Sequence, residues 1–536
     1  MNVKNRRVHM SRWVSLCFNF KVWLAVPSVF MLMSLSSPVE FSDADQKEAI
    51  TYYVDATAGD DSNRGDEQSQ AFRSLSKINE LKLQAGDQVL FKRGHKWSGT
   101  LKPQGSGTEK APIVIGAYGE GARPSIDGEG KKEETDTMSA GLILYNQEYF
   151  EIRDIEIRNF EKGDPAKPIK KAGIFVLAKD IGTLHGFKFE NVRIADVNGS
   201  LKTRENGGVF FSVIADEDPD KRVPTNFDGI YMVDCHIYNV DRGGFLNQSY
   251  WRNRDFDSKF GEMSANNKLN NWYPSLNLLI EKCKFEEIGG NGLVTRVVAA
   301  PVVQNNLFIR NSTKTTGNAS YPYNCDDALW QFNEACYTVY NEGDVDASGF
   351  DSDYLCKNTI IQYNYSHHND WGGLLVCSWG QVTNSFNDGT IVRNNIFQDE
   401  KHHMIRFSGN ITNTEISSNL FVTTSELNDV MMWYKEWGEI WPDKTVIKDN
   451  IFYNEGAEQF MKLGETTGNE ISGNVLMGNS FRDKPQIGTT AKKKETNAMK
   501  SKVNQIREVS NRKDIQVSKA TEVIKIMWPD QVPMNP

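Results

Sequence analysis

A short motif of apolar and polar positions recurs along most of the chain. An apolar residue and two variable residues precede an inward-facing small residue, and further apolar residues follow it. Asn occupies the inward position in seven successive copies, at intervals of 27, 31, 31, 24, 31 and 24 residues: Asn306, Asn333, Asn364, Asn395, Asn419, Asn450 and Asn474. We call this site the ladder position. Its spacing predicts stacked coils of three short parallel strands and three turns, which advance by ~4.8 Å per coil.

Earlier copies of the motif carry other residues at the ladder position, namely Cys283, Cys235, Val192 and Ile155, at intervals of 37 to 48 residues. These longer coils contain insertions, and insertions in a solenoid map to loops on a binding face. Stacked Asn amides can hydrogen-bond from coil to coil and so satisfy polar groups that would otherwise be buried without partners. A second strand begins about nine residues after the ladder position, as at Gly244, Gly292 and Gly373. This constant offset lets side chains be assigned to common outward-facing rows.

Two other repeat folds do not fit the sequence. Propeller blades need about 40 residues with four strands each, and leucine-rich repeats need a dense Leu pattern. We therefore predict an all-β fold, a right-handed parallel β-helix over residues 37–482, with a helical cap at Phe72–Leu83 and short strands before the coils. The segment 483–536 is Lys-rich, lacks the ladder Asn, and is expected to be a helical cap or partly disordered.

The first 36 residues have the pattern of a secretory signal peptide. Lys4, Arg6, Arg7 and Arg12 precede an apolar run at 22–35 and small residues suited to cleavage. Its removal would take five positive charges, including Lys21, and no acids, so the net charge would change from −9 to −14. We expect a secreted or periplasmic bacterial protein that is monomeric, does not stay inserted in a membrane, and does not bind nucleic acid.

Six cysteines remain after the predicted signal peptide, and none has the paired spacing of a zinc site. Disulfides or buried thiols are therefore expected. Cys325 and Cys356 each precede their ladder Asn by eight residues, so they should stack on adjacent coils at a separation compatible with a disulfide.

Three stretches resemble the pectin-lyase-like superfamily of right-handed parallel β-helices: Tyr52–Asp61, Ala85–Gly94 and Gly349–Asn369. They look like secreted bacterial β-helix proteins used on polysaccharides, among them glycoside hydrolases acting on fucans, fucosides or xylan. The resemblance covers roughly residues 50–480 and implies the fold. It implies a carbohydrate-related function only broadly, because this scaffold carries hydrolases, lyases and epimerases. No lyase or polygalacturonase signature matches residue by residue.

The richest acidic stretch contains Glu342, Asp344, Asp346, Asp351 and Asp353. Alternation with Phe350 and Ser352 on a strand places both Asp351 and Asp353 on the face opposite the core, where we expect them to point into solvent. Glycoside hydrolysis needs one protonated and one ionised carboxyl, and close like charges supply that difference. We predict catalytic roles for Asp351 and Asp353, with Glu342 or Asp344 as further candidates. The alternatives are an acidic turn or a calcium site; no other metal or cofactor is expected.

Other candidates lie on neighbouring coils. By the nine-residue offset, Arg406 shares an outward row with Asp351, and Arg296 shares the row of Asp353. Either Arg would suit a substrate carboxylate or sulfate, or would form a salt bridge to the acids.

Histidines and tryptophans complete the candidate set. His367-His368 and His402-His403 occupy matching places, so His367 could assist proton transfer and His403 could contact substrate, although exposed turn histidines are the commoner case. Trp371, Trp379, Trp433, Trp437 and Trp441 lie in or near the following turns, and we expect at least one to stack on a sugar.

Three functions are consistent with these features. The first is a secreted glycoside hydrolase acting on an anionic or branched polysaccharide, such as a sulfated algal or plant glycan. The second is a polysaccharide lyase that holds calcium against a uronic acid and removes the C5 proton with a basic side chain. The third is a non-catalytic glycan-binding β-helix.

Overall fold

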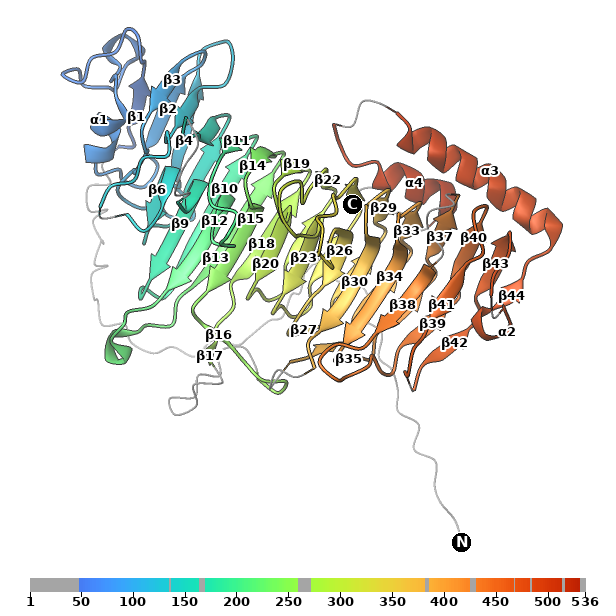
Figure 1. Cartoon of the computed structure of the whole chain (residues 1–536). Coiled ribbons are helices and arrows are strands. Elements are labelled where there is room, and N and C mark those ends of the chain that lie inside the picture. Colours follow the sequence, from blue (N-terminus) through green and yellow to red (C-terminus); the bar gives the residue numbers. More distant parts are fainter. Residues whose placement is uncertain are drawn as a thin grey trace, which may run out of the picture. The chain divides into compact units, whose positions relative to one another are not determined.

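The computed structural model describes residues 48–530 except 135, 163–168, 259–270, 381–384, 425–429, 467, 483 and 513–515. The predicted signal peptide lies outside these residues. None of the helices in the described part is long and apolar enough to cross a membrane. From Ala49 onward the chain is one compact unit. Three long parallel sheets run the length of this unit, and successive strands of a coil alternate between them (Figure 1). The predicted parallel β-helix is confirmed.

Sheet one contains β1 (Thr51–Val54), β2 (Gln88–Lys92), β4 (Ile113–Tyr118), β7 (Phe150–Arg153), β10 (Thr183–Glu190), β13 (Asn226–Val233), β18 (Leu276–Glu281), β21 (Val302–Gln304), β24 (Leu329–Gln331), β28 (Ile360–Gln362), β32 (Ile391–Arg393), β36 (Glu415–Ser417), β39 (Val446–Lys448) and β42 (Glu470–Ser472). Sheet two contains β3 (Lys96–Ser98), β5 (Ser125–Asp127), β8 (Glu156–Asn159), β11 (Arg193–Val197), β14 (His236–Val240), β19 (Lys284–Ile288), β22 (Leu307–Ile309), β25 (Glu334–Cys336), β29 (Tyr365–His367), β33 (Ile396–Gln398), β37 (Leu420–Thr423), β40 (Ile451–Asn454), β43 (Val475–Gly478) and β44 (Thr489–Thr490).

Sheet three carries the candidate site. It contains β6 (Ser139–Tyr145), β9 (Lys171–Lys179), β12 (Gly207–Ile214), β15 (Gly243–Ser249), β20 (Leu293–Arg296), β23 (Ser320–Tyr323), β26 (Ser348–Ser352), β30 (Gly372–Ser378), β34 (His403–Gly409), β38 (Val430–Lys435) and β41 (Phe460–Lys462). Short additional pairings join β16 (Arg252–Asn253) to β17 (Asn271–Trp272), and β27 (Cys356–Lys357) to β31 (Asn387–Asp388) and β35 (Ile411–Thr412). The helical elements are η1 (Gln68–Gln70), α1 (Leu75–Glu80), η2 (Pro219–Lys221), α2 (Lys484–Ile487), α3 (Lys493–Ser510) and α4 (Ala520–Met527).

The Asn ladder stands at the turn between sheets one and two. Each ladder Asn is almost completely buried. The side-chain amide of Asn364 donates to the Oδ1 atom of Asn395 at 3.0 Å, and the amide of Asn333 donates in the same way to Asn364. The residue before each of these Asn has positive φ, as at Tyr363 (56°) and Asn394 (55°), which makes the tight turn. The predicted ladder from Asn306 to Asn474 is confirmed.

Apolar side chains fill the inside of the coils. Inward residues such as Phe350, Leu374 and Ile405 are fully buried in one continuous cluster. The strand alternation predicted around Phe350 is therefore correct, with Phe350 inside and Asp351 on the outer face of sheet three. Because the scaffold is packed throughout, outward side chains on adjacent strands are held at fixed spacings of ~4.8 Å.

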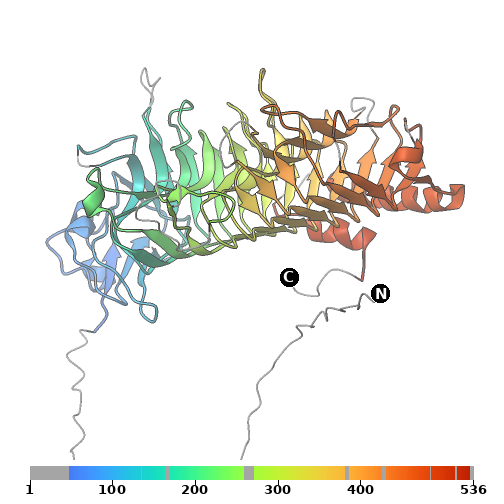
Figure 2. The ribbon, with the colours of Figure 1, turned by 90° about the horizontal axis from the view of Figure 1, so that it is seen from below.

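The Lys-rich segment after residue 482 forms α2, α3 and α4. Helices α3 and α4 cover the outer face of sheet two at the C-terminal end (Figure 2), where Val503 and Ile524 pack against Tyr365 and Leu420. The backbone N–H of Lys519, at the start of α4, donates to the carboxylate of Glu334 in β25. This segment is thus part of the core packing of the fold.

The six cysteines of the described chain are buried free thiols. Cys325 and Cys356 stack on adjacent coils as expected, since Asp326 and Lys357 beside them are paired. The expectation of a disulfide between them is not met. Both thiols lie in apolar surroundings, which stabilise the neutral form and raise the pKa of each.

Candidate functional site

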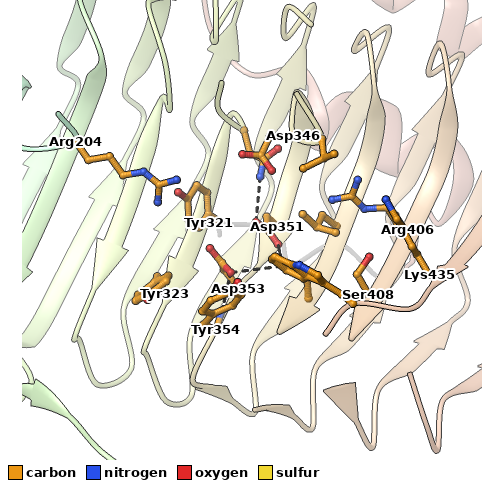
Figure 3. A pocket seen from close by; sticks show the side chains of 15 residues that line it. Arg204, Tyr321, Tyr323, Asp346, Asp351, Asp353, Tyr354, Arg406, Ser408 and Lys435 are labelled. Atoms are coloured by element: carbon orange, nitrogen blue, oxygen red, sulfur yellow. Dashed lines mark hydrogen bonds between the residues drawn. The ribbon is translucent and has the colours of Figure 1, made fainter. Parts of the chain in front are cut away.

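A cavity of about 390 Å³ opens on the outer face of sheet three (Figure 3). Its base consists of side chains from β23, β26, β30, β34 and β38. Loop residues Arg204, Val345, Asp346 and Trp437 stand around this base. The size is within the range of ligand pockets, ~300–1,000 Å³.

Two outward rows form the base of the cavity. In the first row, Asp351 pairs with Leu375, Leu375 with Arg406, and Arg406 with Trp433. In the second row, Cys377 pairs with Ser408 and Ser408 with Lys435, and Asp353 lies beside Cys377. The predicted register of Arg406 with Asp351 is confirmed. Because strand pairing fixes both rows, the relative positions of these side chains are determined by the backbone.

Three carboxyl groups face the cavity: Asp346, Asp351 and Asp353. A carboxylate oxygen of Asp351 lies within 4.8 Å of one of Asp353 and of the thiol of Cys377. Asn318 donates to Asp351 at 3.0 Å, and the hydroxyl oxygen of Thr316 lies 3.0 Å from a carboxylate oxygen of Asp346. Asp351 is 2% exposed, so the expectation that it points into solvent is wrong. It faces outward from the sheet, but the surrounding loops and side chains remove it from water.

Burial and mutual repulsion separate the protonation states of these acids. Desolvation, followed by the charges of Asp353 and Asp346, raises the pKa of Asp351 well above its ordinary value. Desolvation also raises the pKa of Asp353, to about 6, although hydrogen bonds from Tyr354 and Cys377 oppose this shift. Asp351 is therefore the more strongly desolvated acid of the pair, and Asp353 has hydrogen bonds that favour its ionised form. A carboxylic acid beside a carboxylate is the arrangement that acid/base catalysis requires.

The other predicted acids lie outside the cavity. Glu342 is exposed on the loop before β26. Asp344 is buried behind this loop, where its carboxylate accepts hydrogen bonds from Thr316 and from the backbone N–H groups of Val345 and Asp346. Asp344 thus holds the loop that places Asp346, the third acid of the cavity.

The predicted arginines have different environments. Arg406 is 4% exposed and lines the cavity. Arg296 lines a smaller neighbouring hollow with Arg204 and Arg242, and its guanidinium lies 4.8 Å from the ring centroid of Tyr323. Within the described chain neither Arg296 nor Arg406 forms an ion pair, so the expected salt bridge to the acids is absent.

His367 is not brought to the cavity. It lies in β29 of sheet two, fully buried, with its Nε2 atom 3.1 Å from Glu334 beneath α4. The expectation of an exposed turn histidine is wrong here, because α4 covers this part of sheet two. His403 is also buried and outside the cavity lining; burial, followed by the Arg406 charge, lowers its pKa well below the ordinary value. Neither histidine is placed to transfer a proton to a ligand in the cavity.

The predicted tryptophans also differ in whether they line the cavity. Both faces of Trp371 are covered, by Tyr340 at a centroid distance of 4.8 Å and by His402 at 4.0 Å, so Trp371 has no free face for a sugar. Trp379 is 38% exposed just after β30 and does not line the cavity. Trp437 does line it, with Tyr354 at 5.5 Å.

Several cavity residues were missing from the sequence-based candidate list: Arg204, Tyr321, Tyr323, Tyr354, Cys377, Ser408 and Lys435. The nine-residue offset could have found Cys377 and Ser408, because they alternate with Leu375 and Arg406 along their strands. Arg204 comes from a loop and has no such signal.

Comparison with known proteins gives one relative by sequence and a similar solved structure. No family model matches the chain. A lacto-N-biosidase of Bifidobacterium longum subsp. longum is 26% identical over 467 aligned residues, which cover 74% of this chain and 29% of that protein. The chain therefore spans less than a third of its curated relative.

A solved structure of another lacto-N-biosidase is also similar to this chain. The crystal structure of a GH136 lacto-N-biosidase from Eubacterium ramulus superimposes with a TM-score of 0.60 at 26% identity, over 80% of this chain and 67% of that one. Its selenomethionine form gives a TM-score of 0.60 at 24% identity. The resemblance to β-helical polysaccharide-processing proteins is confirmed, and among them the likeness is to a glycoside hydrolase.

Proposed function

We propose that this protein is a glycoside hydrolase whose reaction takes place in the cavity on sheet three. The observation that carries the proposal is the pair Asp351, which is buried, and Asp353, which is half-buried, with oxygens within 4.8 Å of each other and with raised pKa values. The likeness to lacto-N-biosidases supports the same class of reaction.

The spacing of the two carboxyl groups favours net retention of anomeric configuration. Retaining glycosidases hold their carboxyl groups ~5–5.5 Å apart, whereas inverting enzymes need ~6.5–9.5 Å to admit a water. Protonated Asp351 gives its proton to the glycosidic oxygen, and the leaving sugar departs with that oxygen. The carboxylate of Asp353 bonds to the anomeric carbon. Asp351 then takes a proton from water, which attacks the same carbon and releases Asp353.

Neighbouring side chains in the cavity orient Asp351 and Asp353. Cys377 donates to Asp353 at 3.4 Å and Asn318 to Asp351 at 3.0 Å, so both carboxyl groups are oriented before substrate arrives. The charge of Asp346, like that of Asp353, favours the protonated form of Asp351. Tyr323, Tyr354 and Trp437 supply aromatic surface for sugar rings. The signal-like first 36 residues favour action outside the cytoplasm.

The test is hydrolysis by the purified full chain. The substrates are oligosaccharides that carry lacto-N-biose, as the relatives' name suggests, together with neutral, uronic-acid and sulfated polysaccharides. We expect a new reducing end, with the β- or α-configuration of the substrate retained in the first product seen by proton NMR. An unsaturated product that absorbs in the near ultraviolet would instead identify a lyase. Binding without any cleavage would identify a glycan-binding protein.

A further inference from the structure

One end of the cavity carries two buried side chains whose hydrogen-bond donors have no partner among the described residues, next to an exposed lysine. Arg406 and Ser408 project from β34, two residues apart and therefore on the same face, and Lys435 pairs with Ser408 from the next coil. All three line the cavity, and Figure 3 shows them together on the side away from Arg204. The acids Asp346, Asp351 and Asp353 lie between the two ends.

Arg406 and Ser408 are buried, at 4% and 3% exposure. The Nε and Nη1 atoms of Arg406 and the Oγ atom of Ser408 have no hydrogen-bond partner within the described residues. A buried donor without an acceptor costs ~1–3 kcal/mol, and more when it is charged. Three such atoms at one end of a cavity indicate that a ligand supplies the acceptors.

The protein's own acids do not serve as that acceptor. Leu375 lies between Asp351 and Arg406 in the outward row, so Asp351 and Arg406 are two coils apart, ~10 Å between backbones. The intervening apolar side chain keeps the guanidinium from pairing with the catalytic carboxyl. Arg406 thus differs from Arg254, a comparably buried arginine that pairs with Asp326 at 2.8 Å.

The adjacent cations favour a negatively charged group. Partial desolvation, followed by repulsion from Arg406, lowers the pKa of Lys435, so the two positive charges oppose each other. A bound anion relieves this repulsion, whereas a neutral hydroxyl does not. Arg204, at the other end of the cavity, is exposed and solvated, so its guanidinium does not need a bound anion.

We propose that Arg406, Ser408 and Lys435 form a subsite for an oxyanion, a carboxylate or sulfate carried by a sugar bound next to the catalytic acids. The inference rests on the proposed function for its location in the substrate path. It adds a substrate class: glycans with an acidic substituent one sugar from the cleaved bond. The guanidinium fork would bind two oxygens of the group, and Lys435 and Ser408 would bind the remaining lone pairs.

The test uses monosaccharides, which cannot be hydrolysed, so it is independent of turnover. Binding of glucose, glucuronate and glucose 6-sulfate to the full chain is measured by ligand-observed NMR titration. We expect at least one of the two anions to bind about tenfold or more tightly than glucose, as charge-assisted hydrogen bonds predict. The stronger of the two identifies carboxylate or sulfate as the preferred group.

Substitutions test which residues cause the preference for an anionic sugar. In Arg406→Gln and Lys435→Gln the ratio of the affinity for the anion to the affinity for glucose should fall to nearly one. Lys462→Gln removes an exposed positive charge from the adjacent strand β41 and should keep the preference. Lys435 is exposed, so its replacement does not threaten folding even if Arg406→Gln is unstable. Equal binding of glucose and both anions, or an unchanged preference in Lys435→Gln, would overturn the subsite. Failure of hydrolysis with retained anion preference would instead overturn only the proposed function.

Discussion

The thiol of Cys377 lies 3.4 Å from a carboxylate oxygen of Asp353 and donates to it across two neighbouring coils. This contact lowers the pKa of Asp353 against the larger effect of burial. A side chain from β30 therefore adjusts the acid that follows β26, and the distance between them is set by strand pairing.

Removal of the Cys377 thiol should shift the pH profile of the enzyme. Asp353 must be ionised to act, so kcat/KM should fall as the pH drops through its pKa of about 6. Cys377→Ala removes a donor that stabilises the carboxylate, so this acidic limb should move to higher pH. Cys377→Ser keeps a donor and should stay close to the parent. An acidic limb at the same pH in all three proteins would contradict the assigned role of Asp353.

Replacement of either catalytic carboxyl should abolish most activity without unfolding the protein. Asp351→Asn removes the proton donor and Asp353→Asn removes the nucleophile, so each should lower kcat at least ~100-fold. Circular dichroism should show an unchanged β-helix. Glu342→Gln, an exposed acid on the nearby loop, is the matched control and should retain parental activity. Full activity of both Asn variants would move the site elsewhere.

Asp351→Asn should also change how stability depends on pH. Because the folded-state pKa of Asp351 is raised, its proton stabilises the folded state at low pH, and this contribution is lost as the pH rises toward the folded-state pKa. The Asn variant does not titrate there. Its melting temperature relative to the parent should therefore be higher at pH 8 than at pH 4. A constant difference across this range would show that the folded-state pKa of Asp351 is not raised.

The Asn ladder should contribute strongly to stability. Asn364→Leu removes the acceptor used by the amide and the backbone N–H of Asn333. It also removes one of the two donors to Asn395, which keeps only the backbone N–H of residue 364. Since each buried polar group left unpaired costs ~1–3 kcal/mol, the free energy of unfolding should fall by at least ~3 kcal/mol. Asn497→Leu, at an exposed position of α3, should have little effect. Equal urea midpoints for the two variants would refute the role of the ladder.

The C-terminal helices should stabilise sheet two. Ile524 is fully buried in α4 against the coils, so Ile524→Ala should cost ~2–5 kcal/mol of stability. The neighbouring Lys525 is exposed, and Lys525→Ala should be nearly neutral. Thermal melts of the two variants distinguish a packed cap from a loosely attached tail, which would tolerate both changes equally.

Chelation should leave the protein unaffected. The closest donor set in the cavity, Asp351, Asp353 and Cys377, includes a thiol, whereas calcium prefers oxygen ligands. We therefore expect the same hydrolysis rate and melting temperature with and without EDTA. A loss of either that calcium restores would revive the calcium alternative and with it the lyase mechanism.

The sequence alone determined the solenoid, its register and the outward rows. The interval between ladder Asn residues and the constant offset to the next strand are properties of the local repeat, because each coil pairs only with its neighbours. For the same reason the row shared by Asp351, Leu375 and Arg406 could be assigned before the structure was known. The acid-rich stretch that contains Asp351 and Asp353, together with strand alternation, predicts both as candidates.

The tertiary structure decided what covers each outward row. Loops of irregular length bring Arg204, Asp346 and Trp437 over the outer face of sheet three, so that Asp351 is buried and Asp353 half-buried where the sequence predicts both in solvent. Helix α4 crosses back over sheet two and buries His367, more than 150 residues earlier in the chain, beneath Lys519. Neither outcome has a signal in the repeat, because desolvation depends on segments that lie far away in sequence, and desolvation sets the protonation states on which the chemistry depends.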